Sequence, residues 1–555
     1  MTAPITIFTK QGCPHCAKAK EIFDTEGLHY ENHDIEKSKR NVDLAVYLSG
    51  ASTVPQIFIG DHYVGGADEL ALLAEAGRIQ EIVSHAGLME HPDSFSDEEL
   101  AEGAEDFKLR EAIPEIDGSK STKDEDLPIL RMYKEFFGFW PNCFYYMYRW
   151  PEVAYRQFVY CHNAGAIGGG KHVIGAPVMY AVGFATSEAQ GCDYCQVHSA
   201  STGGEESAGY TKYIREAREG NFGDDNPFGP FEVALAELAA KASTNHVTPD
   251  TLEAVRNASG EARFTKLPPG PNIEATALIA AAFGFLNVFN DLTGVEVEAG
   301  WAQNASDNAG IDTGRHGSSE EDRDNLAYDI SDGGSSMKAM IAHYAKDVVL
   351  AGGPARYAKK HLDLAPGWIE SWPLALRPLH ARFYVGVMTN EDDHGMGIAP
   401  ELKHLMARVS AIGKRHDYLA ATEGYMAWLA GGESDKALNR VEACYDAARD
   451  FSTCSDLFSQ REIAALRLAW ISARVPLTTP HRWVKAAIGL FSPDELVHLI
   501  SVCAMASMTQ RFVAVEKPEQ EAEVTRWIGK HGLTPDTLSL RHPVQMPVSL
   551  EEVLP

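Results

Sequence analysis

The pattern of apolar and polar positions divides the chain into a short mixed part and a long helical part. Near the N-terminus the apolar run Ile5-Thr6-Ile7-Phe8 indicates a buried strand, and residues 56–59 and 62–64 indicate two more. Helical spacing occupies residues 17–24, 69–76 and 78–85. Residues 1–88 are therefore predicted to fold in the order β-α-β-α-β-β-α, as a small α/β domain.

From residue 127 onward the apolar spacing is helical and convincing strand alternation is missing, as in residues 231–239 and 462–470. Residues 273–289 and 496–512 are apolar nearly all round, so we expect both helices to be buried in a core or against another subunit. The predicted fold class is multidomain: an α/β domain of thioredoxin-like order followed by a mostly all-α region.

The helical region reads as two copies of one unit, because apolar helices, Asp-Tyr pairs and Thr-Pro turns recur in the same order. A repeat this long predicts a duplicated domain rather than a solenoid. The predicted divisions are 1–88 for the first domain, 89–126 for a mobile acidic linker, 127–300 for copy one, 301–370 for a connecting insert, 371–530 for copy two and 531–555 for a tail.

Composition narrows the classes of protein. The 555 residues carry 49 Lys and Arg against 78 Asp and Glu, a net charge of −29, which argues against nucleic acid as a partner. No apolar run approaches the roughly 20 residues that a membrane helix needs. Nine cysteines are too few for a disulfide scaffold. We expect a cytoplasmic protein.

Two pairs of cysteines carry the candidate chemistry. Cys13 and Cys16 follow the first predicted strand and open a helix, where free amide groups and the helix dipole stabilise a thiolate. Cys192 and Cys195 form a second pair in the first helical copy. A structural zinc site at either pair would need two more ligands nearby, so no metal is predicted. Two dithiols on two domains suggest that electrons pass between them.

The first 88 residues resemble the glutaredoxin family, with Cys-Pro-x-Cys, Thr53-Val54-Pro55 and Gly65-Gly66-Ala67-Asp68 in that family's order and spacing. The resemblance implies that Pro55 is cis and faces the dithiol, and that Val54 offers its backbone to glutathione. It also implies that Lys10 and Asp68 bind the charged ends of the tripeptide. Cys13 would then attack and Cys16 would resolve.

Each helical copy resembles the alkylhydroperoxidase D-like family, which includes the carboxymuconolactone decarboxylases; residues 189–198 carry the likeness. The resemblance implies an all-helical fold that assembles into trimers or hexamers, with Cys195 peroxidatic and Cys192 resolving. His198, one turn after Cys195, is the nearest candidate base, although an ordinary polar role fits it equally. The family's relay positions hold Tyr180, which reads as a core-lining aromatic, and Ser199. Glu188 and His162 are the candidates to replace them.

The remaining candidates are weaker. Cys143, Cys161, Cys444, Cys454 and Cys503 are expected to be packed side chains, with Cys161-His162 the one pair that suits a further resolving thiol. Copy two has no cysteine at the equivalent positions, where His416 and Glu423 are candidates to line a pocket. The insert around residues 310–325 has loop composition and is assigned no chemistry, and its histidines, His316 included, lack metal-ligand spacing.

The sequence therefore predicts a thiol-dependent peroxidase that carries its own reductase, with glutathione as reductant, a peroxide as substrate and no tightly bound cofactor. We expect a homo-oligomer of trimer type with no nucleic-acid or membrane partner. Two alternatives stay open: a glutathione-dependent disulfide or deglutathionylation reductase, and a non-redox decarboxylase-like enzyme with a regulatory glutaredoxin.

Overall fold

Four short strands form one mixed sheet at the N-terminal end of the chain. In the computed structural model, which describes residues 4–87, 94–323, 336–390, 396–449 and 456–533, their order is β2-β1-β3-β4. β1 (Ile5–Thr9) runs parallel to β2 (Glu31–Asp34) and antiparallel to β3 (Gln56–Ile59), which pairs antiparallel with β4 (His62–Gly65). The helices are α1 (Pro14–Thr25), α2 (Lys39–Ser49), α3 (Ala67–Glu75) and α4 (Ile79–His85). The predicted α/β order is confirmed.

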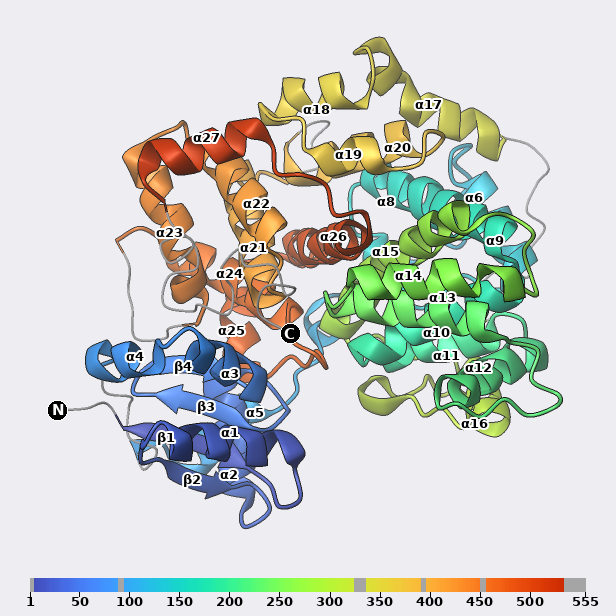
Figure 1. The fold of residues 1–555 in the computed structure, drawn as a ribbon. Helices are drawn as coiled ribbons and strands as arrows, with labels where there is room; N and C mark the ends of the chain where they lie inside the picture. Colours follow the sequence, from blue (N-terminus) through green and yellow to red (C-terminus); the bar gives the residue numbers. More distant parts are fainter. Residues whose placement is uncertain (1–3, 88–93, 324–335, 391–395, 450–455, 534–555) are drawn as a thin grey trace.

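The two faces of this sheet belong to different cores, because successive side chains of a strand point to opposite sides. Ile5 and Ile7 pack with residues of α1 and α3, including Phe23, in a small core of their own. Phe8 and Phe58 lie on the other face, with α2, and their core is continuous with that of the helical region. The N-terminal domain therefore packs directly on the remainder of the chain, as Figure 1 shows.

The remainder of the described chain is helical, as predicted. Its first part consists of α6 (Leu127–Phe136), α7 (Cys143–Met147), α8 (Glu152–Phe158), the π-helix η3 (Val159–Ile167), α9 (Gly168–Ile174), α10 (Ala176–Gln190), α11 (Asp193–Ser201), α12 (Glu205–Arg218), α13 (Pro230–Ser243), α14 (Pro249–Ala258), the 3-10 turn η4 (Ser259–Glu261) and α15 (Pro269–Thr293).

The connecting insert is itself mostly helical where it is described. It contains α16 (Ala299–Ala309), the 3-10 turn η5 (Gly314–His316), α17 (Met337–Leu350), α18 (Pro354–Leu362) and α19 (Gly367–Ser371). The second part consists of α20 (Arg377–Met388), α21 (Pro400–Gly413), α22 (Asp417–Ala430), α23 (Asp435–Arg449), α24 (Gln460–Ser472), α25 (His481–Leu490), α26 (Pro493–Glu516) and α27 (Ala522–His531). Most of the predicted tail lies outside the described residues.

Helices α10 to α15 and α21 to α26 follow one another in the same order and with similar lengths, apart from α11 and α22. Where the two runs meet, residues at equivalent positions bind one another. Lys414 Nζ donates to Gln190 Oε1 at 3.1 Å, and Arg511 Nη1 donates to Asn287 Oδ1 at 2.8 Å; both pairs are 224 positions apart. The runs thus face each other through matching residues.

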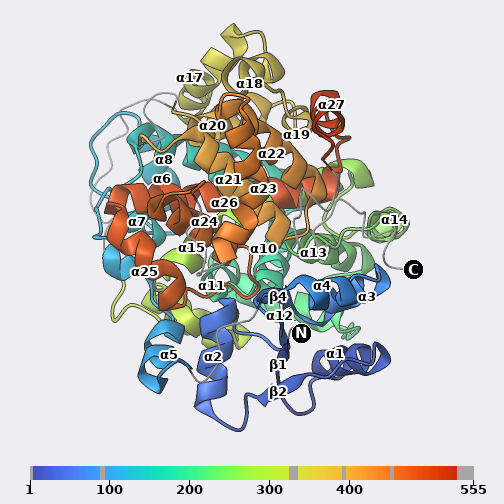
Figure 2. The same cartoon turned by 90° about the vertical axis from the view of Figure 1, so that its left-hand side faces the viewer.

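The longest helices of the described chain, α15 and α26, pack against each other at the centre of the molecule (Figures 1 and 2). α26 begins with Ser492 as N-cap, Pro493 in the first turn and Glu495 returning a hydrogen bond, a favourable start for a helix. By length and composition both helices are long enough to cross a membrane, contrary to the sequence expectation. Both are largely buried inside the chain, which is how a core helix of an ordinary protein behaves.

The segment expected to be a mobile linker is instead packed against the helical region. Helix α5 (Asp97–Ala104), predicted from its capping sequence, begins after Ser96. A 3-10 turn, η2 (Leu109–Ala112), follows. Between them, Phe107 N donates to Thr479 O at 2.9 Å and His481 N donates to Glu105 O at 2.8 Å. Acidic composition predicted solvation, but the apolar side chains Leu100 and Leu109 are fully buried and hold the segment in place.

Candidate active site

Cys13 lies where strand β1 gives way to helix α1. It is the N-cap of α1, and its sulfur accepts a hydrogen bond from the Cys16 amide at 3.2 Å. Free amides at a helix N-terminus stabilise a thiolate at this position. Burial and a hydrogen bond with Cys13 raise the pKa of Cys16 to about 11, so Cys16 stays protonated. The difference suits the predicted roles, in which Cys13 attacks and Cys16 resolves.

The other predicted residues of this end of the sheet surround Cys13. The Val54–Pro55 bond is cis, as predicted, and the carbonyl of Val54 lies 3.9 Å from the Cys13 sulfur. Asp68 opens α3 and pairs at 3.0 Å with Lys18, a partner that the sequence did not predict. Burial alone would raise the pKa of Asp68, but the hydrogen bond and charge of Lys18, together with the charges of Arg415 and His15, lower it. Lys10 is exposed directly after β1.

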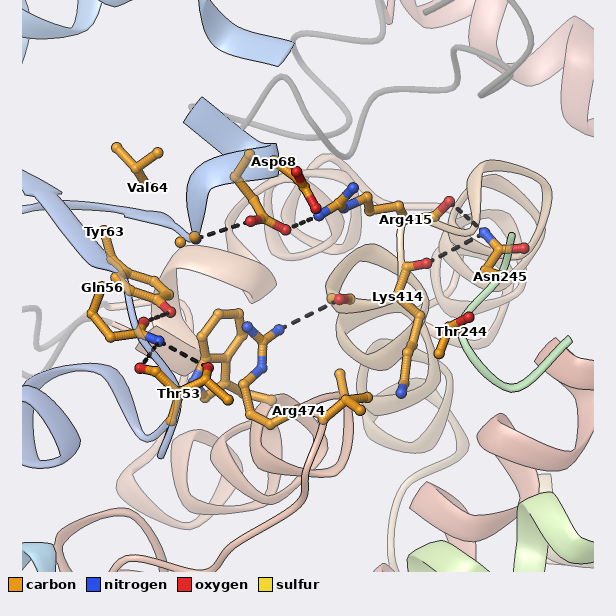
Figure 3. Close-up of a pocket in the computed structure, with 18 of the residues that line it drawn as sticks. Thr53, Gln56, Tyr63, Val64, Asp68, Thr244, Asn245, Lys414, Arg415 and Arg474 are labelled. Atoms are coloured by element: carbon orange, nitrogen blue, oxygen red, sulfur yellow. Dashed lines mark hydrogen bonds and ion pairs between the residues drawn. The ribbon is translucent and has the colours of Figure 1, made fainter. Parts of the chain in front are cut away.

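A pocket of about 340 Å³ lies between this end of the sheet and the helical region (Figure 3). Arg415 forms an ion pair with Glu69 across it, and the guanidinium of Arg474 stacks on Trp470 at 3.6 Å. Both sides of the pocket contribute polar side chains: Thr53, Gln56 and Asp68 from the N-terminal domain, and Asn245, His246, Lys414, Arg415 and Arg474 from the helical region.

The wall of this pocket touches the chain just before the second dithiol. Gln190 accepts a hydrogen bond from the Lys414 ammonium and donates one at 3.2 Å to the Arg474 carbonyl. The next residue, Gly191, has a φ of +79° and lies so close to Pro476 that a Cβ there would approach a Pro476 carbon to 2.8 Å. Only glycine fits this turn, and it sets Cys192 at the start of α11.

Comparisons with known proteins agree with the geometry around Cys13. A profile of the glutaredoxin family matches residues 5–64. The glutaredoxin of Pseudomonas aeruginosa is 35% identical over 82 residues, which are 15% of this chain and 96% of that protein. Glutaredoxin 3 of Escherichia coli K12 is 32% identical over 81 residues, 15% of this chain and 98% of its own length. The chain belongs to the glutaredoxin family.

A second kind of relative is longer. The hybrid peroxiredoxin hyPrx5 of Haemophilus influenzae is 46% identical over 66 residues, which are 12% of this chain and only 27% of that protein. A solution structure of glutaredoxin from Brucella melitensis is 33% identical and covers 15% of this chain and 89% of its own, with a TM-score of 0.14. The family profile and the two glutaredoxin relatives assign the glutaredoxin domain and a thiol–disulfide redox function.

Outside the glutaredoxin domain, the second dithiol lies at the joint between α10 and α11. Cys192 is the N-cap of α11 and is 0% exposed; Cys195, in the first turn, is 2% exposed. The amide of Asn290 donates to the Cys195 sulfur at 3.4 Å. Burial, followed by a hydrogen bond with Cys195 and the charge of Asp291, raises the pKa of Cys192 well above its usual value.

Cys195 lines a cavity of about 790 Å³, whereas Cys192 lies behind it and does not. The cavity has mostly apolar walls, including Met179, Phe283 and Leu286. Tyr180 and Ser199, which occupy the family's relay positions, both line it, as does the buried thiol of Cys143. Cys143 is thus a second cysteine in this cavity, although the sequence treated it as an ordinary packed residue.

His198 also lines the cavity, and its partner is a residue that the sequence did not reveal. His198 Nε2 lies 2.7 Å from Glu298 Oε2, while Tyr194 and the Asn142 amide donate to Glu298 Oε1 at 3.1 and 2.6 Å. Burial favours protonation of Glu298, but the charge and hydrogen bond of His198 outweigh burial and lower the pKa of Glu298. Glu298 therefore stays ionised and orients the imidazole.

The proposed replacements for the relay are placed elsewhere. Glu188 pairs with Arg218, and His162 is fully buried beside Asn163 with its pKa lowered by burial to about 4. Neither lines the cavity, and nor does Cys161. Nothing in the spacing could have found Glu298, because it lies 100 positions from His198 and reaches it only through packing of the segment between α15 and α16.

In the second helix run, the positions equivalent to Tyr180 and Ser199 hold a buried His–Glu pair, and no thiol lies beside it at the positions of the dithiol. Glu423 Oε2 lies 2.7 Å from His404 Nδ1, and Tyr384 donates to Glu423 Oε1 at 2.8 Å. His416, the N-cap of α22, is buried with its pKa lowered to about 4. None of these side chains lines either of the two pockets described above. This half contributes Arg511 instead, a buried cation whose charge faces Cys192, Cys195 and Asp291.

Proposed function

We propose that the protein is a thiol-dependent peroxidase whose helical dithiol is regenerated by its own glutaredoxin domain. The observation that carries the proposal is the asymmetry of the second dithiol: Cys195 lines the apolar cavity beside the His198–Glu298 pair, whereas Cys192 is buried behind it. A peroxide in the cavity would therefore meet Cys195 first, within one helical turn of a base.

The chemistry divides into two exchanges. The Cys195 thiolate attacks the peroxide, the O–O bond breaks, and the alcohol or water leaves with a proton from His198, leaving a sulfenic acid on Cys195. Cys192 then displaces water and closes a disulfide. Cys13 attacks that disulfide, Cys16 resolves the mixed disulfide, and two glutathione molecules reduce Cys13–Cys16 and leave as glutathione disulfide.

The cavity favours an organic hydroperoxide over hydrogen peroxide. Its volume of about 790 Å³ and its aromatic and aliphatic walls suit a ligand with an apolar body, whose burial gains about 25 cal/mol per Å². The matched helix runs support a duplicated alkylhydroperoxidase D-like region. The name of the Haemophilus relative, a hybrid peroxiredoxin, points to the same combination of chemistries.

Glutathione fits the pocket between the domains. Of the residues predicted to bind glutathione, Asp68 lines this pocket, whereas the Val54 carbonyl lies beside Cys13 outside its lining; Arg415 and Arg474 add cations from the helical region that suit the tripeptide's carboxylates. The same pocket touches the segment leading into Cys192 through Gln190, but neither dithiol lines it, so transfer of electrons between the two dithiols would require the glutaredoxin domain to move.

Consumption of NADPH by glutathione reductase, with tert-butyl hydroperoxide as substrate, tests the proposal. Cys195→Ser should abolish turnover, and Cys192→Ser should consume about one equivalent and then stall as the sulfenic acid. Cys503→Ser, a buried thiol in α26 far along the chain, serves as the matched control and should retain turnover. Full turnover in both Cys192→Ser and Cys195→Ser would contradict the peroxidase. Glutathione-dependent reduction of a disulfide substrate without any peroxide reaction would favour the reductase alternative instead.

A further inference from the structure

Three buried side chains meet beneath the second dithiol. The Cys192 sulfur, a carboxylate oxygen of Asp291 and a ring nitrogen of His316 lie within 4.8 Å of one another, and each residue is at most 1% exposed. They come from three elements: the N-cap of α11, the last turn of α15, and η5 of the connecting insert. The loop composition of that insert predicted no chemistry for it, and the position of His316 corrects this expectation.

The hydrogen bonds of this cluster leave one Asp291 carboxylate oxygen without a partner among the described residues. His316 Nε2 lies 3.0 Å from Asp291 Oδ1, and His316 Nδ1 lies 2.8 Å from the carbonyl of Val295. The second carboxylate oxygen, Asp291 Oδ2, is buried and accepts no hydrogen bond from the described residues. An unpaired buried carboxylate oxygen is costly, so a donor is expected there, and the Cys192 S–H, which interacts with the Asp291 carboxyl group, can supply it.

Charged groups from every neighbouring element shape this site. The cations Arg511 of α26 and Lys414 of α21 face it, and the Arg315 side chain donates to the Asp291 carbonyl. Asp193 of α11 adds a further carboxylate. Cys192 itself keeps its proton at neutral pH because of burial, and it therefore needs a base before it can attack another sulfur.

Cysteine, aspartate and histidine also suit a metal ion, yet the arrangement favours a proton acceptor. Nδ1 of His316 contacts the Val295 carbonyl, which can only accept, so Nδ1 carries a proton. The contact between Nε2 and Asp291 then needs one more proton, either on Nε2 or on the carboxyl group. A bound metal would displace that proton and occupy the sulfur that the disulfide needs. A buried carboxylate beside a thiol can accept the proton that the thiol must lose, without a metal ion.

We propose that Asp291, oriented by His316, is the base that deprotonates Cys192 when the helical disulfide closes; this rests on the proposed function. The Cys192 proton moves to Asp291 Oδ2 as its sulfur bonds to the Cys195 sulfur. The S–O bond of the sulfenic acid breaks, and the departing hydroxide leaves as water with a proton from His198, which solvent has protonated again after the peroxide step; Asp291 then returns the Cys192 proton to solvent. Asp291 is thus a catalytic residue and His316 a positioning residue.

The test isolates disulfide closure from peroxide chemistry. The full-length protein, carrying Cys13→Ser and Cys16→Ser, is treated with 2,2′-dithiodipyridine. The first thiopyridone released marks a mixed disulfide on Cys195, and the second marks attack by Cys192; mass spectrometry verifies the Cys192–Cys195 disulfide. A parallel series uses tert-butyl hydroperoxide with dimedone to trap the sulfenic acid.

Asp291→Asn should leave the first release within about twofold of the parent and slow the second about 100-fold at pH 7, the size expected for a lost general base. Its second step should then rise about tenfold per pH unit, because solvent hydroxide must replace the base, whereas the parent is flatter. Asp307→Asn, which removes an exposed carboxylate of α16 outside the cluster, should match the parent in both steps.

His316→Gln, which keeps Asp291 but removes its partner, should give a smaller slowing and provides a second variant if Asp291→Asn fails to fold by circular dichroism. Closure at the parental rate in a folded Asp291→Asn or His316→Gln would overturn the proposal. Stoichiometric zinc in the parent that is lost in His316→Gln would also overturn it, in favour of a metal centre. If the variants slow the second thiopyridone release as expected but the parent does not react with tert-butyl hydroperoxide, the peroxidase function is wrong and the role of Asp291 stands.

Discussion

At the scale of single residues, burial and hydrogen bonds distinguish the two sulfurs of each dithiol. In both pairs the predicted resolving thiol is the more deeply buried of the two and keeps its proton: Cys16 at 2% exposure beside Cys13 at 8%, and Cys192 behind Cys195. At the helical dithiol a neighbouring imidazole, His198, is held by a carboxylate that the sequence did not connect to it. The reactivity of each pair therefore depends on single contacts as much as on Cys-x-x-Cys spacing.

Replacing Glu298 with Gln should slow oxidation of Cys195 by about 10- to 100-fold at pH 7, less than loss of the base itself, because His198 keeps its place but loses its ionised partner. Stopped-flow fluorescence or rapid thiol quenching of the reduced protein with tert-butyl hydroperoxide measures this rate. Glu423→Gln breaks a different buried Glu–His pair, in the second helix run, and is the control. If Glu298→Gln and Glu423→Gln show equal rates of Cys195 oxidation, the pair of His198 and Glu298 takes no part in the reaction with peroxide.

At the scale of elements, the segment between the two domains is fixed to the helical region by hydrogen bonds and ion pairs and does not hang free between them. Asp106 lies between α5 and η2, and it accepts hydrogen bonds from Arg315, Lys108 and the Thr479 amide. These contacts join the insert, the segment and the loop before α25. Burial raises the pKa of Asp106, but the hydrogen bond and charge of Arg315 outweigh burial and hold the pKa well below its usual range.

Because the folded-state pKa of Asp106 lies below its unfolded value of about 3.9, its contribution to stability is present above that pH and is lost as the pH falls below about 4. Asp106→Asn should lower the thermal unfolding midpoint at pH 7, through a loss of about 1–3 kcal/mol. The difference from the parent should shrink steadily toward pH 3. Glu253→Gln, which breaks an exposed ion pair at 3.8 Å, is the control and should change little. A constant difference at all pH values would contradict the assignment.

At the scale of the whole molecule, the glutaredoxin domain is docked on the helical region. Arg482 donates to the carbonyl of Tyr47 at 3.0 Å, Arg449 donates to the carbonyl of Tyr63 at 3.0 Å, and Tyr63 meets Trp470 edge-on at 5.9 Å. Both thiols of the helical dithiol are buried in this arrangement. Direct transfer from Cys13 to that disulfide therefore requires the docked domain to separate and turn.

If undocking limits electron transfer, weakening the interface should speed it. The double variant Arg449→Ala with Arg482→Ala should raise the rate at which reduced Cys13 and Cys16 open the Cys192–Cys195 disulfide, by about fivefold or more for a loss of about 1 kcal/mol. Oxidation of Cys195 by peroxide should not change. Arg256→Ala, in an exposed ion pair, is the control. Slower transfer in the double variant would mean that docking itself positions the donor.

Pairing of α15 with α26 within one chain removes one reason for expecting an oligomer, since these helices no longer need another subunit to cover them. The trimer-type assembly implied by the family resemblance stays a prediction. Static light scattering at micromolar concentration distinguishes it from the 60.7 kDa monomer.

The sequence by itself determined the features that depend on neighbouring residues. A strand followed by Cys-Pro-His-Cys places Cys13 at a helix start, and the periodicity of residues 231–239, 462–470 and 493–512 specifies helices, because both rest on contacts within a few positions. The cis bond before Pro55 was implied by the glutaredoxin resemblance, which the local motifs carry.

Only the tertiary structure decided what surrounds the second dithiol. Glu298 reaches His198 across 100 positions, and Asp291 and His316 reach Cys192 from the end of one helix and from an insert whose composition reads as a loop. The acidic segment after residue 88 looked solvated, yet it is held by a few buried leucines and by Arg315. These side chains carry no local pattern, because what brings them together is the burial of α15 and α26 against each other, a free-energy gain that belongs to the whole chain.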